Sequence, residues 1–136
     1  MAAYHGPMLN LRTLLASVGA ACALGGCGVG IGIDIGPDDD PPSVSLTSTP
    51  GSAAAGQAVR LSADARDDGW IDEVAFYRLE PDGRSTYLGR DTSAAYELNA
   101  LVPATALRGS TVFFFARAYD DVGQSTDSVA VGVSVL

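Results

Sequence analysis

The chain has 136 residues, a formal net charge of −8 at pH 7 and a hydrophobic fraction of 47%. Its eight basic residues are all arginines, and they are spread along the sequence without a cluster that would attract a phosphate backbone. No stretch reaches the roughly 20 consecutive apolar residues of a membrane-spanning helix. Composition therefore predicts one ordinary globular domain, and it argues against a nucleic-acid-binding protein and a polytopic membrane protein.

The N-terminal region has the pattern of a secretory leader. Residues 1–12 are polar and weakly basic, and residues 13–24 (TLLASVGAACAL) form an apolar run that ends in small residues. The run is too short for a stable spanning helix but suits the apolar core of a signal peptide. We expect a cleaved signal peptide over residues 1–26, with Met1 or Met8 as its first residue.

The end of this leader resembles a known processing motif. The stretch LGGC at 24–27 is similar to the bacterial lipobox, in which a branched residue and two small residues precede a cysteine. The resemblance implies cleavage before Cys27, diacylglycerol on its sulfur and acylation, for example by palmitate, of the new amine. Each buried CH₂ of such chains contributes about 0.8 kcal/mol to membrane binding. The alternative is an ordinary secretory signal with an incidental cysteine.

The residue after Cys27 gives a further expectation about location. It is Gly28, and not the aspartate that in such lipoproteins favours retention in the inner membrane. We therefore expect a lipid-anchored protein of the bacterial cell envelope, with its acyl chains in the outer membrane.

Residues 27–42 are expected to form a tether between the anchor and the folded domain. The segment is rich in glycine, proline and aspartate, and it cannot bury enough apolar surface to order itself. Its alternating Ile and Val leave open a strand added to a partner's sheet. The acidic run at 38–40 is interpreted as a solvated spacer instead of a cation site.

Residues 43–136 have the pattern of an all-β sandwich. Short runs of alternating apolar and polar residues are separated by turn residues at fairly regular intervals. In the last run Val129, Val131, Val133 and Val135 are expected to face the core together. The predicted strands cover residues 43–48, 58–65, 71–79, 85–90, 93–102, 111–119 and 127–136. About seven antiparallel strands in a segment of this length predict an immunoglobulin-like fold.

Four segments of this region resemble the bacterial Ig-like domains of cell-surface proteins: PPSVSLTS, GQAVRLSADARDDGWIDEVAFYR, SAAYELN and FFARAYDDVGQST. The resemblance covers nearly all of residues 42–136 and implies a module of the kind that recurs as repeats in long adhesins or accompanies secreted hydrolases, here present as a single copy. The chain differs from antibody domains because no cysteine pair joins its strands and because Trp70 precedes the third predicted strand.

Catalysis is not expected. Once the leader is removed, the chain has no histidine, no lysine and only the acylated Cys27, so a nucleophile and its base would have to come from hydroxyls or carboxylates. The adjacent carboxylates at 67–68 and 120–121 leave a small envelope hydrolase as an alternative.

The same acidic loops suggest a possible metal site. Asp64, Asp67 and Asp68 follow the second predicted strand, and Asp120 and Asp121 follow the sixth. In an Ig topology these two loops lie at one end of the sandwich. Ca²⁺ takes six to eight oxygen ligands, which loop carboxylates and carbonyls can supply. The alternative to this Ca²⁺-dependent adhesion module is ordinary turn capping by aspartate, with no cofactor at all.

The sixth predicted strand also suggests an interaction surface. Alternate residues of VFFFARAY face the core, which leaves Phe113, Phe115 and Tyr119 on the outer face, and Tyr77 of the third strand should join them. Exposed aromatic side chains on a sheet exterior are typical of a binding surface for an envelope protein or a glycan. Trp70, beside the acidic loops, is a further candidate contact. The alternative is that other segments cover these rings.

Overall fold

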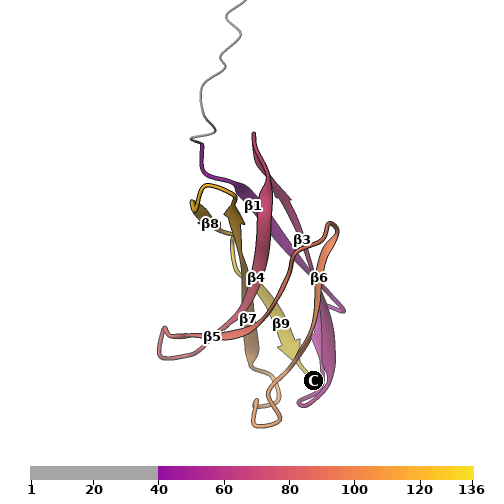
Figure 1. Cartoon of the computed structure of the whole chain (residues 1–136). Helices are drawn as coiled ribbons and strands as arrows, with labels where there is room; N and C mark the ends of the chain where they lie inside the picture. The colour runs from indigo at the N-terminus through magenta and orange to yellow at the C-terminus, as the bar shows by residue number, and fades with distance from the viewer. Residues whose placement is uncertain (1–39) are drawn as a thin grey trace, which may run out of the picture. The chain divides into compact units, whose positions relative to one another are not determined.

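The structure is a computed structural model that describes residues 40–136 (Figure 1). The expected signal peptide, Cys27 and most of the tether lie outside the described residues. Every regular element between residues 40 and 136 is a strand, and this part of the chain has no helix that could cross a membrane. The strands are β1 (Ser43–Thr49), β2 (Ser52–Ala53), β3 (Ala58–Arg66), β4 (Ile71–Leu79), β5 (Ser85–Asp91), β6 (Tyr96–Leu101), β7 (Thr111–Asp120), β8 (Ser125–Asp127) and β9 (Val131–Val135).

The strands form two sheets that pack face to face. The smaller sheet has the order β1-β3-β6, and the larger has the order β2-β9-β7-β4-β5 with β8 also paired to β7. All neighbours are antiparallel except β2 and β9, which run parallel. This arrangement confirms the predicted all-β, immunoglobulin-like sandwich.

The core consists of the inward faces of both sheets. Leu61 of β3, Phe76 of β4 and Phe114 of β7 are fully buried at its centre. The alternation that predicted these faces is seen in the burial pattern of β3 and β7. Burying a side chain of this size contributes about 1.5–3 kcal/mol to folding, so a domain of this length can hold together without a disulfide.

After β1 the chain crosses from the smaller sheet to the larger one. Pro50 has no N–H to donate, and β1 ends just before it. The next residues, β2, then pair with β9, and the carbonyl oxygens of Gly51 and Ala53 accept hydrogen bonds from Ser134 and Leu136 at 3.0 and 3.1 Å. The segment predicted to be only a turn therefore also closes an edge of the larger sheet.

The last predicted strand is interrupted, which corrects one expectation. The hydroxyl of Ser128 accepts a hydrogen bond from the Ala116 N–H at 3.0 Å, and the Ser128 N–H donates to the Ala116 carbonyl at 2.8 Å. The chain bulges after Ser128, and Val129 is 87% exposed. The prediction that Val129 faces the core is wrong, whereas the other three valines of that run do pack on it.

The strand β6 begins three residues later than predicted. The carboxylate of Asp91 accepts hydrogen bonds from the N–H groups of Glu97 and Ser93, both at 3.0 Å. These bonds hold residues 92–95 in a bend between the sheets, and they lower the pKa of Asp91.

The sandwich has two ends of different character. We call the end with residues 40–42, the β3–β4 loop (67–70) and the β7–β8 turn (121–124) the linker end. The opposite end, with the β4–β5 turn (80–84), the β6–β7 loop (102–110) and Leu136, is the distal end.

Candidate functional site

The two acidic loops lie side by side at the linker end, as the Ig topology predicted. The Asp121 N–H donates to the Trp70 carbonyl at 3.2 Å, and Ile71 and Asp120 are partners in the β4–β7 register. The topology therefore brings the five candidate aspartates to the same end of the domain.

The aspartate side chains of the β3–β4 region are used locally. Asp67 Oδ2 accepts a hydrogen bond from the Gly69 N–H at 3.0 Å, which is an Asx turn. Asp64 and Arg66 are both exposed near the end of β3 and form an ion pair at 3.1 Å, and the hydrogen bond that Arg66 donates to Asp64 raises the pKa of Arg66. Asp68 is exposed.

Asp120 has the most buried of these carboxylates. The residue is only 3% exposed, and its Oδ1 accepts hydrogen bonds from the N–H groups of Val122 and Gln124 at 3.0 and 2.7 Å. The side chain thus closes the β7–β8 turn from within, whereas its neighbour Asp121 is exposed. Capping explains the position of Asp120 without a ligand.

No three acidic, histidine or cysteine side chains between residues 40 and 136 are grouped so that they could hold a metal ion. Two carboxylate oxygens at the linker end, Asp67 Oδ1 and Asp120 Oδ2, are nevertheless buried without a hydrogen-bond partner. Such atoms are uncommon in folded proteins. Calcium binding stays a prediction, for which these two oxygens are the starting point.

The predicted outer aromatic face is present on the larger sheet. The rings of Tyr77 and Phe115 are stacked, with centroids 5.0 Å apart and an interplanar angle of 10°. Tyr87 of β5 meets Tyr77 edge-on at 5.6 Å. Phe113 lies against Gly132, where an added Cβ would come within 3.2 Å of the ring. We call Tyr77, Tyr87, Phe113 and Phe115 the aromatic cluster.

One arginine organises the border of this cluster. The Arg117 guanidinium lies 5.6 Å from the centroid of the Tyr77 ring and donates two hydrogen bonds to Asp127, at 2.5 and 2.9 Å. The pKa of Arg117 is raised mainly by its hydrogen bond to Asp127 and secondly by that to Tyr119. The hydrogen bond from Arg117 in turn lowers the pKa of Asp127. The pKa of Tyr77 is raised mainly by burial of its hydroxyl and secondly by a hydrogen bond with Tyr119.

The cluster is open to solvent at two of its rings. Phe113 is 43% exposed and Tyr87 is 55% exposed, while Tyr77, Phe115 and Tyr119 are half-buried by their neighbours. The sequence did not single out Tyr87. Its register position opposite Tyr77 follows from a β-bulge between Phe76 and Tyr77, and alternation alone does not reveal a bulge.

Trp70 does not belong to this cluster. It is an exposed residue of the loop before β4, at the linker end, whereas the cluster lies on the sheet face formed by β4, β5 and β7. The predicted binding residues therefore fall into two separate surfaces.

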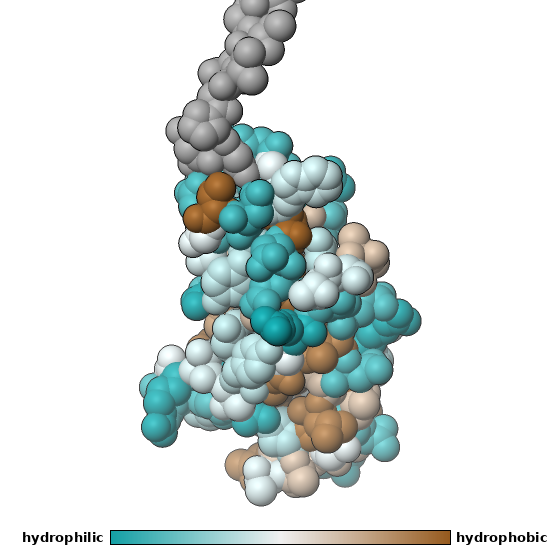
Figure 2. All heavy atoms as spheres, viewed as in Figure 1, coloured by the Kyte–Doolittle hydropathy of each residue, from teal (hydrophilic) through white to brown (hydrophobic). Residues whose placement is uncertain are grey.

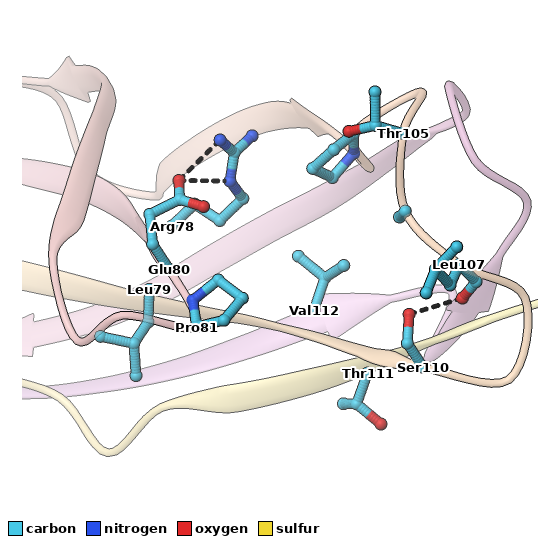
Figure 3. A pocket seen from close by; sticks show the side chains of 11 residues that line it. Arg78, Leu79, Glu80, Pro81, Thr105, Leu107, Ser110, Thr111 and Val112 are labelled. Carbon is cyan, nitrogen blue, oxygen red and sulfur yellow. Dashed lines mark hydrogen bonds and ion pairs between the residues drawn. The ribbon is translucent and has the colours of Figure 1, made fainter.

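A pocket at the distal end was not expected from the sequence. It has a volume of about 360 Å³ and lies between the β4–β5 turn and the β6–β7 loop. Apolar side chains form most of its walls, with the Arg78–Glu80 ion pair at one side (Figure 3). Its residues come from segments far apart in the sequence, so no local pattern could have identified it.

Two packed sheets of antiparallel strands, with the short β2 pairing in parallel with the last strand β9, define the class: an immunoglobulin-like β-sandwich module. A model of the family described as Bacterial Ig domain matches residues 42–112, more than half of the chain. The chain therefore belongs to the bacterial Ig domain family. Domains of this family are typically non-catalytic modules, often surface-exposed, which at a coarse level agrees with a non-enzymatic protein of the cell envelope.

Comparisons with individual proteins gave the following results. No curated protein sequence matches the chain. Among solved structures, it is similar to the pectate lyase Pel3 from Pectobacterium carotovorum, with 18% sequence identity and a TM-score of 0.46. The match covers 71% of this chain and 27% of that lyase, so the chain spans about a quarter of the lyase's length.

Proposed function

We propose that the protein is a lipid-anchored, non-enzymatic binding module of the bacterial cell envelope, attached to the outer membrane through acyl chains on Cys27. Membership of the bacterial Ig domain family supports the envelope location and the lack of catalysis. The lipobox-like LGGC at 24–27 and the apolar run before it support the anchor.

The aromatic cluster is the observation that supports a binding role. Two of its rings are open to solvent on a sheet exterior, where polar residues are the norm. Tyrosine, phenylalanine and arginine are enriched where proteins bind one another. Of the two expected partner classes we favour a protein, because aromatic rings beside an arginine are the side chains enriched at protein interfaces.

Metabolic labelling with an alkyne-bearing palmitate tests the anchor. Wild-type protein and Cys22→Ser should both incorporate the label, and Cys27→Ser should incorporate none. Cys22 is a matched control because it lies in the same leader, five residues earlier in the sequence. Continued labelling of Cys27→Ser would overturn the proposed anchor.

Site-specific photocrosslinking in the envelope tests the binding face. A crosslinking side chain at Phe113 or Tyr87 should give the same discrete adduct, and one at the exposed Thr47 on the opposite sheet should give none. No adduct at either cluster position, or equal adducts at Thr47, would argue against the cluster as the contact surface.

A calcium-dependent variant of this function rests on the two unpartnered carboxylate oxygens at the linker end. A cation bound by Asp67 and Asp120 would stabilise the two loops together, because a ligand that binds only the folded state raises its stability. Melting curves in calcium and in chelator should then differ by several degrees, and Asp67→Asn should remove the difference. Identical curves for the wild type would eliminate the calcium site.

A further inference from the structure

The distal pocket has apolar walls and a built polar rim. Pro81 lies on one side, Leu107 on the other and Val112 between them, whereas the Leu79 side chain points away from Val112 (Figure 3). Ala106 and Pro103 also contribute to the lining. Its volume of about 360 Å³ is within the range of ligand-binding pockets, which are mostly apolar with a few placed polar groups. The surface around this end shows several hydrophobic residues (Figure 2).

The polar rim holds further N–H groups of Arg78 and a further carboxylate oxygen of Glu80. Arg78 donates through Nε and Nη2 to Glu80 Oε1, at 2.9 and 2.6 Å, and the Thr86 hydroxyl donates to the same oxygen at 2.6 Å. The hydrogen bond from Thr86, and secondly those from Arg78, lower the pKa of Glu80. The Glu80 side chain is therefore a carboxylate at neutral pH. Arg78 Nη1 and Glu80 Oε2 are not used by these three hydrogen bonds, and both side chains are partly exposed.

The pocket walls are held in place before any ligand arrives. Pro81 and Pro103 restrict the backbone of the turn and the loop. The loop is tied by hydrogen bonds from Ala106 N–H to the Pro103 carbonyl at 2.9 Å and from Gly109 N–H to the Val135 carbonyl at 2.8 Å. A preformed site loses less entropy on binding than a flexible one.

We propose that this pocket binds a segment of a partner protein, with a bulky aliphatic or aromatic side chain in the apolar cavity and a main-chain amide on the Arg78–Glu80 pair. The pair is neutral overall and offers N–H donors beside a carboxylate acceptor, so it can pair with both the carbonyl and the N–H of a peptide group. The aliphatic walls carry no flat ring on which a sugar could stack. The proposal depends on neither the lipid anchor nor the aromatic cluster.

The experiment is an amide-resolved NMR titration of the full chain, made non-acylated by Cys27→Ser, with capped pentapeptides that have glycine at every position but the third. Peptides with leucine or phenylalanine at that position should give saturable shift changes at Leu79, Ala106 and Val112, and the serine peptide should give none. The Asp67 and Trp70 amides, at the linker end, should not respond. Absence of saturable changes at the pocket would overturn the proposal.

Isobutanol separates peptide recognition from simple apolar binding. It presents the branched end of a leucine side chain without an amide, and it should produce no saturable change. Equal, saturable shifts with isobutanol and with the leucine peptide would show a pocket for small apolar molecules and would overturn the assignment to a protein segment.

Two leucines of the distal end give a matched pair of variants. Leu107 lines the pocket and is 77% exposed, whereas Leu101 is exposed at the same end but does not line it. Leu107→Ser should weaken the leucine peptide at least about tenfold, and Leu101→Ser should leave its affinity unchanged. Because both side chains are exposed, both variants should fold, and equal effects would contradict binding in the pocket.

Discussion

The linker end and the distal end of the sandwich use their side chains in opposite ways. At the linker end the carboxylates of Asp67 and Asp120 accept hydrogen bonds from N–H groups of the turns in which they lie. At the distal end, exposed leucines lie around a pocket whose rim is the Arg78–Glu80 ion pair. The difference agrees with a stabilising role for the linker end and with our proposal that the distal end receives a partner segment.

The physical reason lies in how each type of group is satisfied. A carboxylate near a tight turn can accept hydrogen bonds from the N–H groups that the turn leaves free, which satisfies one oxygen each of Asp67 and Asp120 and leaves the other without a partner. An exposed leucine has no such local solution, because only contact with another apolar surface removes it from water. The four experiments below test this division, from the largest expected effect to the smallest.

Asp120→Ala should cause the largest loss of stability. It removes the acceptor of two hydrogen bonds inside the β7–β8 turn and should lower the free energy of unfolding by about 3 kcal/mol. Denaturant unfolding measures this loss. Asp121→Ala, one residue further and exposed, is the control and should change stability by less than about 0.5 kcal/mol. Similar losses in both variants would mean that charge, and not capping, matters at this end.

Ser128→Ala should have the next largest effect. The hydroxyl accepts a hydrogen bond from the Ala116 N–H where β8 gives way to β9, and its loss leaves a buried donor without a partner. We expect a loss of about 2 kcal/mol, measured by the same unfolding experiment. The exposed Ser125→Ala should be near neutral. An unchanged midpoint for Ser128→Ala would show that water replaces the hydroxyl.

Asp127→Asn should have a small effect that depends on pH. Because Arg117 depresses the pKa of Asp127 below its ordinary value of 3.8, the pair's stabilisation is complete above that value and is lost as the pH falls through the lower folded-state pKa. Since both side chains are partly exposed, the loss at pH 7 should be below about 1 kcal/mol. Melting temperatures of wild type and variant should converge in acid, whereas the unpaired, exposed Asp72→Asn should show no such convergence.

Leu107→Ser should have the smallest effect on stability. The side chain is exposed, so its removal should change the free energy of unfolding by less than about 0.5 kcal/mol, although it should weaken peptide binding. Thermal unfolding provides the measurement. A loss above about 1 kcal/mol would mean that the distal leucines serve the fold, and the contrast between the two ends would then disappear.

Much of the fold was predictable because sheet faces leave a period-two signal. Alternation identified the buried side of β3 and of β7, including Leu61 and Phe114, and it placed Phe113, Phe115 and Tyr77 on the outer face. It failed at Val129, where the Ser128 hydroxyl stands in for a main-chain acceptor and shifts the phase of the strand. This side-chain hydrogen bond depends on Ala116 of the neighbouring strand, twelve residues earlier, so no local sequence pattern reveals it.

The sequence by itself determined the all-β class, the approximate positions of the longer strands and the accumulation of aspartates in two loops, since propensity, alternation and turn chemistry are local properties of the chain. Tertiary structure alone decided that Asp120 is a buried cap, that Tyr87 joins the aromatic cluster and that a pocket opens beside Arg78 and Glu80. These features arise where segments distant in sequence meet, and such meetings depend on register, bulges and packing that no short stretch of sequence specifies.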